Sequence, residues 1–137
     1  MDSHELEGGC LCGATRYRVS GPVENLCCCH CRSCRLAAGA PFVAWGTFQT
    51  ARFQPLGARL AEHASSARVR RGFCGTCGTT LTYLHEGRAG QLDVALATLD
   101  DPSALRPEFH LWVSEKLPWV SVDDLPAYPE WRPRPSS

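Results

Sequence analysis

Cys29-His30-Cys31-Arg32-Ser33-Cys34 is the densest of the three cysteine clusters that together decide how this chain folds. Three cysteines within six residues bring three sulfurs to one place on the backbone. Two further cysteine pairs lie on either side of it, in Cys10-Leu11-Cys12-Gly13 and in Cys74-Gly75-Thr76-Cys77-Gly78. The glycines allow the tight turns that point backbone amides at the sulfurs. Each cluster is therefore predicted to be a metal knuckle.

The nine cysteines are predicted to bind metal and not to form disulfides. Their number is odd, and residues 1–9 contain acidic side chains and no apolar segment typical of a signal peptide. In a reducing compartment, clustered thiols are more often metal ligands or catalytic groups than disulfide partners. We therefore expect a cytoplasmic zinc protein, in which Cys27 and Cys28 can also be small core residues.

Composition is typical of one globular domain. The chain has 137 residues, of which 44% are hydrophobic and 20% charged. We expect a zinc-binding domain over residues 5–125 and a proline-rich tail over 126–137. Fourteen basic residues balance fourteen acidic ones, which argues against a nucleic-acid partner. No run approaches the roughly 18 apolar residues that span a bilayer, so no membrane partner is expected, and the oligomeric state stays open.

Short apolar or alternating runs, separated by turn signals, predict a mainly β fold of antiparallel sheets. The expected strands cover residues 15–19, 23–28, 42–48, 67–73, 79–84, 92–99 and 109–113. At most one or two short helical turns are expected. One covers Arg32 to Ala38, where Gly39 and Pro41 provide the stop, and another covers Asp101 to Leu105.

The number of sulfur ligands divides the cysteines between two ions. A closed tetrahedral zinc site uses four ligands, which the two remote pairs could supply together: Cys10, Cys12, Cys74 and Cys77. The central cluster would then hold a second zinc with an open position, as catalytic sites do, through Cys29, Cys31 and Cys34. The sequence also allows His30 or Cys28 to complete a site, and iron to replace zinc.

Several ordered motifs resemble those of a known family. They are Gly9-Cys10-Leu11-Cys12-Gly13, Cys29-His30-Cys31-x-x-Cys34-Arg35 with Gly39-Ala40-Pro41-Phe42, and Arg71-Gly72-Phe73-Cys74-x-x-Cys77-Gly78-x-x-Leu81. Leu99-Asp100-Asp101-Pro102 and the segment 109–119 resemble its closing motifs. Over roughly residues 5 to 120 the chain resembles the glutathione-dependent formaldehyde-activating enzyme family.

This resemblance implies a β-tent fold and the same partition of cysteines between a structural and a second zinc. It also implies a carbon-sulfur lyase that forms S-(hydroxymethyl)glutathione from glutathione and formaldehyde. Zinc lowers the pKa of a bound thiol and can polarise a carbonyl, and a three-thiolate shell suits thiol exchange better than water activation. The expected substrate is glutathione or another small thiol and its aldehyde adduct.

Candidate substrate contacts follow from the two carboxylates of glutathione, which require cationic donors. Arg35, Arg71 and Lys116 are the candidates, although each could be a solvated charge, and an arginine near thiolates could simply offset their charge. His110 is a candidate contact or general base, against the interpretation that it hydrogen-bonds within a strand. Among the aromatic residues, Trp45, Trp112 and Trp119 could line a pocket or pack in the core.

A non-enzymatic hypothesis remains beside the lyase. The same domain resembles that of vertebrate centromere protein V, so the chain could be a non-catalytic, zinc-stabilised binding module. A nucleic-acid or tubulin binder should carry a basic extension, which this balanced chain lacks. The charge balance therefore favours the enzyme. A third hypothesis is that the open site buffers zinc or removes thiol-reactive compounds.

Overall fold

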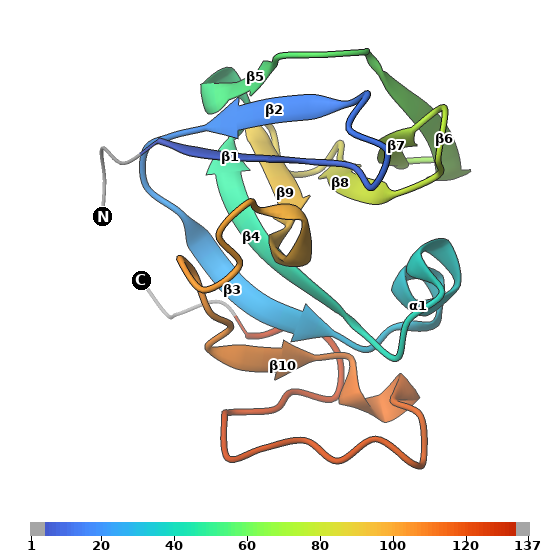
Figure 1. The fold of residues 1–137 in the computed structure, drawn as a ribbon. Coiled ribbons are helices and arrows are strands. Elements are labelled where there is room, and N and C mark those ends of the chain that lie inside the picture. Colours follow the sequence, from blue (N-terminus) through green and yellow to red (C-terminus); the bar gives the residue numbers. More distant parts are fainter. Residues whose placement is uncertain (1–4, 134–137) are drawn as a thin grey trace.

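Two largely antiparallel sheets carry most of the regular structure in the computed structural model, which describes residues 5–133 (Figure 1). The smaller sheet has the order β1-β2-β5, with bounds Leu6–Gly9, Arg16–Val19 and Phe53–Pro55. The larger has the order β10-β3-β4-β9-β8-β7-β6, with bounds Phe109–Leu111, Glu24–Cys29, Val43–Gln49, Gln91–Ala95, Thr80–His85, Val69–Cys74 and Leu60–Ser66. The predicted mainly β class is confirmed.

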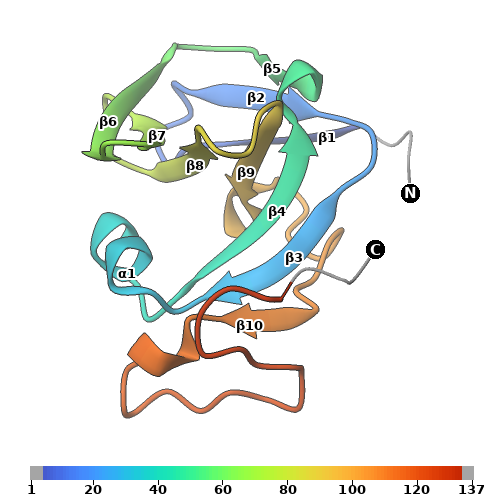
Figure 2. The ribbon, with the colours of Figure 1, turned by 180° about the vertical axis from the view of Figure 1, so that it is seen from behind.

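Tyr17 lies in the core that joins the two sheets. Alternation along β2 buries Tyr17 and Val19 and turns the arginines before each of them outward. The Tyr17 ring stacks on Phe53 of β5 with centroids 5.2 Å apart, and its hydroxyl lies 2.7 Å from that of Thr98. The other buried members of this core are Phe48, Cys74, Leu81, Leu92, Val94, Leu96 and Leu99. In Figures 1 and 2 the small sheet accordingly lies across one end of the large one.

β3 carries the central cysteines and has a hydrogen-bonded neighbour on each edge. It runs antiparallel to β4, where Cys27 faces Trp45, and parallel to β10, where Cys28 faces His110. Cys27, Cys28 and Cys29 are all buried, as is typical of a strand covered on both faces. The pairing with β10 is a parallel exception to the predicted antiparallel arrangement.

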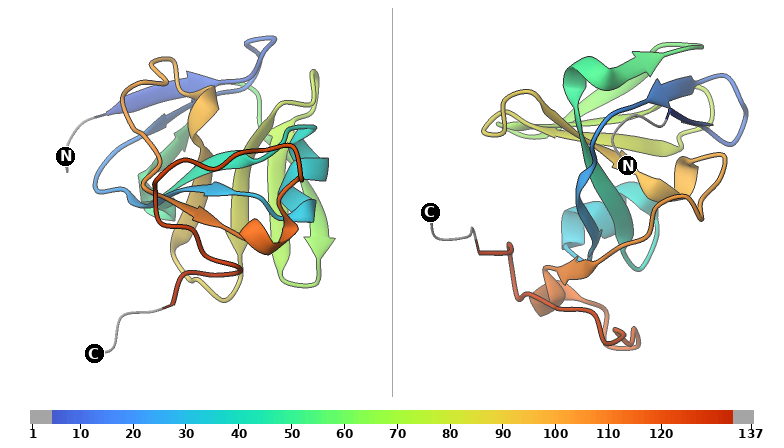
Figure 3. Two further views of the ribbon diagram at one scale, coloured as in Figure 1. Left: turned by 90° about the horizontal axis from the view of Figure 1, so that it is seen from below. Right: turned by 90° about the vertical axis from the view of Figure 1, so that its left-hand side faces the viewer.

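The C-terminal segment lies along β10 (Figure 3). The His110 amide donates to the Pro126 carbonyl at 2.8 Å, and the Tyr128 amide donates to the His110 carbonyl at 3.0 Å. Proline is tolerated here because an edge segment needs only part of its backbone for pairing. Residues 126–132 of the predicted tail therefore pack along β10 and its surroundings, and residues 134–137 lie outside the described part.

α1, Arg32–Ala38, confirms the expected short helix. Cys31 caps its start, because the Cys31 sulfur accepts a hydrogen bond from the Cys34 amide at 3.3 Å. Gly39 ends it in the left-handed conformation with φ of 62°, as predicted from its position. Among the described residues, no helix is long and apolar enough to cross a membrane.

The expected helical turn over Asp101 to Leu105 is wrong. The Asp101 carboxylate accepts hydrogen bonds from the Ser103 amide and hydroxyl at 3.1 and 2.6 Å, which holds the segment in turns. Single 3₁₀ turns form elsewhere, at Thr50–Arg52, Leu96–Thr98 and Val113–Glu115. The second of these ends the strand that was expected over 92–99 at Ala95.

Three strands were not predicted: β1, β5 and β6. β6 is largely exposed and polar, so it has no apolar alternation to reveal it. Gly8 and Gly9 both belong to β1, although a pair of glycines is more typical of a turn. A side chain at Gly8 would lie 2.4 Å from both the Thr98 carbonyl oxygen and the Tyr17 hydroxyl. This strand thus uses glycine for close packing.

We expect Gly8→Ala to destabilise the protein by about 1–3 kcal/mol, because the added methyl group overpacks the core beside Tyr17 and Thr98. Urea unfolding of the metal-loaded protein measures the change. Gly75→Ala is the matched control, since the nearest atom to its new Cβ is the Ala61 Cβ at an ordinary 3.5 Å. Equal stability of the two variants would contradict the close approach at Gly8.

Candidate metal centres

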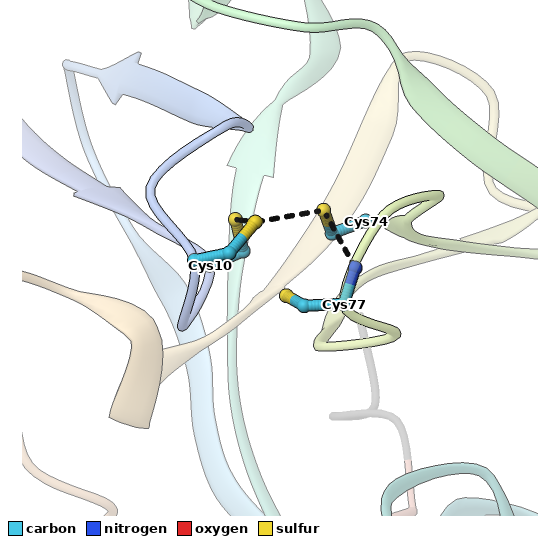
Figure 4. A group of neighbouring side chains, drawn as sticks. Cys10, Cys74 and Cys77 are labelled. Atoms are coloured by element: carbon cyan, nitrogen blue, oxygen red, sulfur yellow. Dashed lines mark hydrogen bonds between the residues drawn. The ribbon is translucent and has the colours of Figure 1, made fainter.

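Four cysteine sulfurs meet where the β1–β2 turn approaches the β7–β8 turn. Figure 4 shows Cys10 on the first turn facing Cys74 and Cys77 on the second. The ligand atoms of these residues and Cys12 lie within 4.8 Å of one another. Cys10 and Cys12 have sulfurs 3.6 Å apart, and Cys12 and Cys74 3.8 Å. Zinc–sulfur bonds of about 2.3 Å in a tetrahedron give sulfur separations of about 3.8 Å, so this cluster fits a closed zinc site.

Backbone amides point at the sulfurs of both turns. Thr15 donates to the Cys10 sulfur at 3.2 Å, and the amides of Thr76 and Cys77 each donate to the Cys74 sulfur at 3.4 Å. Gly78 completes the second turn with φ of 84°, a conformation that suits glycine. Gly13, with φ of 82°, does the same in the first turn, so these two glycines make the turns that their positions predicted.

Hydrogen-bond donors around Cys74 and Cys77 favour the thiolate form of both side chains. The Thr15 hydroxyl and the amides of Cys77 and Thr76 lower the pKa of Cys74 to about 5. The Thr79 hydroxyl, with a sulfur–oxygen distance of 3.2 Å, and the Thr79 amide lower the pKa of Cys77 to about 7. Since the thiolate is the metal ligand, this pair is prepared to bind a cation.

The second cluster forms where β3 enters α1. The sulfurs of Cys29, Cys31 and Cys34 lie within 4.8 Å of one another. Cys29 and Cys34 are buried, and Cys31 is half-buried. His30 and Cys28, the alternative fourth ligands, do not join this group of ligand atoms in the described chain. Three sulfurs in a pocket fit an ion that keeps one open position.

Arg71 lies on β7, which is separated from β3 by three strands of the large sheet, and its side chain extends to this cluster. Its two terminal nitrogens lie 3.7 and 3.8 Å from the Cys34 sulfur, and its Nε donates to the Ser65 hydroxyl at 3.2 Å. The guanidinium is also 4.9 Å from the Tyr83 ring centre. Only 7% of Arg71 is exposed, so its charge is little screened and can offset the negative charge of the thiolates.

A cavity of about 240 Å³ opens beside the three-sulfur cluster. The three cysteines of the cluster line it, together with Cys27 and Arg71. Its aromatic walls are Trp45, Tyr83, Trp112 and Trp131. Trp119, the remaining tryptophan, is 70% exposed and does not line this cavity. Tyr83 and Trp131 were not predicted, because β8 and the C-terminal segment, which carry them, are remote in sequence from Cys29, Cys31 and Cys34.

Arg35, Lys116 and His110 are not among the described residues that line the cavity. Arg35 donates to the His30 carbonyl at 3.3 Å, and Lys116 donates to the Val120 carbonyl at 2.9 Å. Both charges therefore help to hold loops. Of the three predicted cationic contacts, Arg71 is the one that lines the cavity.

His110 connects the buried His30 to the exposed carboxylate of Asp123 through hydrogen bonds. Its Nδ1 lies 2.9 Å from Nε2 of His30, and its Nε2 lies 2.9 Å from a carboxylate oxygen of Asp123. Because the carboxylate accepts, Nε2 of His110 carries its proton and Nδ1 accepts from His30. Burial lowers the pKa of His30 to about 4, so this ring is neutral. This arrangement is consistent with a structural role for His110, that of a histidine hydrogen-bonded within a strand, the alternative to a substrate contact or general base.

Comparison with known proteins gives consistent family relationships. The family model described as glutathione-dependent formaldehyde-activating enzyme matches residues 5–115. An uncharacterized lyase of Schizosaccharomyces pombe is 36% identical over 81 residues, which are 59% of this chain and 58% of that protein. The chain thus spans less than two thirds of that relative.

Two further matches extend over more of the chain. A Halomonas elongata protein, provisionally named a glutathione-dependent formaldehyde-activating enzyme, is 31% identical over 130 residues, covering 86% of this chain and 81% of that one. A crystal structure of a Rhodobacter sphaeroides protein superposes with a TM-score of 0.58 at 22% identity, over 70% of this chain and 89% of that chain, and so shares the fold. The chain belongs to the glutathione-dependent formaldehyde-activating enzyme family.

Proposed function

We propose that this protein is a zinc-dependent carbon-sulfur lyase that acts on glutathione or another small thiol and its aldehyde adduct. The observation that carries the proposal is the three-sulfur cluster, which faces a cavity lined by aromatic side chains. The four-sulfur cluster has a full tetrahedral donor set and is assigned the structural role.

The chemistry is the addition of a thiol to formaldehyde and its reversal. A bond forms between the thiol sulfur and the carbonyl carbon, the C=O π bond breaks, and the thiol proton ends on the carbonyl oxygen. Zinc held by Cys29, Cys31 and Cys34 would supply an open position for the substrate thiolate.

The side chains around the cluster contribute a positive charge near the thiolates and apolar walls around the cavity. Arg71 keeps a positive charge against the Cys34 sulfur, which stabilises a cluster of thiolates as its negative charge grows. Trp45 and Tyr83 lie on the cavity wall with ring centroids 6.0 Å apart and limit the access of water to the sulfurs.

We expect purified protein to contain two zinc ions per chain. Cys74→Ser removes a ligand of the structural ion, so zinc should fall to one per chain or less and the Tm should fall by many degrees. Elemental analysis and thermal unfolding measure both. Cys28→Ala is the control, because Cys28 lies outside both clusters and should leave two ions bound. One ion in the wild type would contradict the second site.

We expect Cys31→Ser to abolish turnover while leaving the fold largely intact, because Cys31 is only half-buried and is not a buried member of either hydrophobic core. The readout is the rate at which ¹³C-formaldehyde exchanges with its thiol adduct, followed by NMR, together with the circular dichroism spectrum. Cys28→Ala again serves as the control. Unchanged turnover in Cys31→Ser would refute the catalytic assignment and favour the non-catalytic binding module.

We expect Arg71→Gln to weaken zinc binding at the second site by about 10–100-fold, the usual effect of removing a partner of a metal ligand. Competition with a chromophoric chelator measures the two affinities separately. Arg70→Gln is the matched control, since Arg70 is the adjacent arginine on β7 and is exposed. Equal zinc affinities for the two variants would show that Arg71 does not stabilise the cluster.

A further inference from the structure

One wall of the cavity comes from outside the region that matches the family model. That match ends at residue 115, whereas Trp131 lines the cavity beside the three-sulfur cluster. Its ring packs edge-on against Trp112 with centroids 5.7 Å apart. The backbone before it is fixed, because the Trp112 amide donates to the Glu130 carbonyl at 3.1 Å and the Ser114 hydroxyl donates to the Pro129 carbonyl at 2.6 Å. The Trp131 wall is thus a feature of this chain's own C-terminal segment.

Arg71, which lines the cavity, and Arg88, which stacks on the Tyr83 ring, are both already engaged. Arg71 uses its Nε on Ser65 and both terminal nitrogens on Cys34. Arg88, behind the wall, makes a two-pronged pair with Asp93 at 2.7 and 3.3 Å. Glutathione has two carboxylates, and neither finds an uncommitted cationic side chain among these residues.

An exposed negative charge, that of Glu115, also lies at the cavity. Glu115 lines the cavity and is exposed, and it forms no ion pair within the described chain. One of its carboxylate oxygens accepts from the Arg32 amide at 2.7 Å, which fixes the group at the start of α1. Arg132, although next to Trp131, is directed elsewhere: its guanidinium stacks 4.2 Å from the Phe109 ring centre. An anionic ligand therefore meets repulsion at the rim.

The small volume of the cavity also disfavours glutathione, as the negative charge of Glu115 does. The cavity volume of about 240 Å³ is below the roughly 300–1,000 Å³ of most small-molecule sites. Part of its wall is the flat face of large aromatic rings, which suits a short apolar chain better than the polar backbone of a tripeptide.

We propose that this cavity selects a compact thiol without carboxylates, uncharged or cationic, over glutathione, and that Trp131 and Glu115 determine this specificity by size and by charge. The inference rests on the proposed function in one respect, that a thiol binds at the three-sulfur cluster.

The test is calorimetric titration of the zinc-loaded protein with thiols of similar length and different charge: 2-mercaptoethanol, cysteamine and 3-mercaptopropionate, with glutathione as the fourth. The wild type should bind 2-mercaptoethanol and cysteamine at least tenfold more tightly than glutathione. Comparing each thiol between wild type and variants removes the effect of its own acidity, because that acidity is the same in every titration.

Glu115→Gln should tighten binding of 3-mercaptopropionate and weaken that of cysteamine, each severalfold, and leave 2-mercaptoethanol unchanged. Trp131→Ala should raise the affinity for glutathione relative to 2-mercaptoethanol by about tenfold, whereas Trp119→Ala, at an exposed tryptophan outside the cavity, should not. Tightest wild-type binding of glutathione, or variant ratios equal to wild type, would overturn the specificity proposal and leave the lyase proposal standing. Binding of none of the four thiols, with two zinc ions present, would overturn both.

Discussion

The close approach of four sulfurs at the meeting of two distant turns is the constraint on which the rest of the structure depends. Cys12 and Cys74 are 62 residues apart in sequence, yet their sulfurs are 3.8 Å apart. Four thiolates at this spacing repel one another unless a cation lies between them, so the position of the small sheet on the large sheet is coupled to cation binding. Cys74 is at the same time a buried member of the core that contains Tyr17, and ligand geometry and core packing therefore share one residue.

The second cluster is built differently, and the difference suits the separate role that we propose for it. Its three sulfurs come from six consecutive residues, and Cys31 also begins α1. A local cluster of this kind closes few long-range contacts, so it can open towards a cavity without loosening the sheets. Arg71 is the long-range element, because β7 must pair correctly with β8 before its guanidinium faces Cys34. The cavity thus combines a local metal-binding motif with walls supplied by the tertiary fold.

Spacing alone predicted the parts of this protein that depend on short stretches of sequence. Both cysteine groups, the helix that ends at Gly39 and most central strands follow from turn chemistry and apolar runs. Features that depend on tertiary contacts were missed. β6 is a polar edge strand, defined by its pairing with β7. Two local side-chain hydrogen bonds were also missed: the Asp101 carboxylate accepts from the Ser103 amide, and Arg35, adjacent to Cys34 in sequence, donates to the His30 carbonyl. Trp131 carries no local signal, since its position is set by the C-terminal segment pairing along β10.

That pairing has a consequence for the behaviour of the protein in concentrated solution. β10 is the last strand of the large sheet, and the bridge between His110 and Ala127 covers part of its outer edge. An uncovered strand edge presents amides and carbonyls to any neighbouring molecule and promotes edge-to-edge aggregation. At the other end of the same sheet, β6 is polar and exposed and contains Glu62 and His63, side chains that discourage such pairing. The segment that supplies Trp131 to the cavity wall therefore also shields the sheet, so the proposed substrate selection and the colloidal stability would depend on one short stretch of chain.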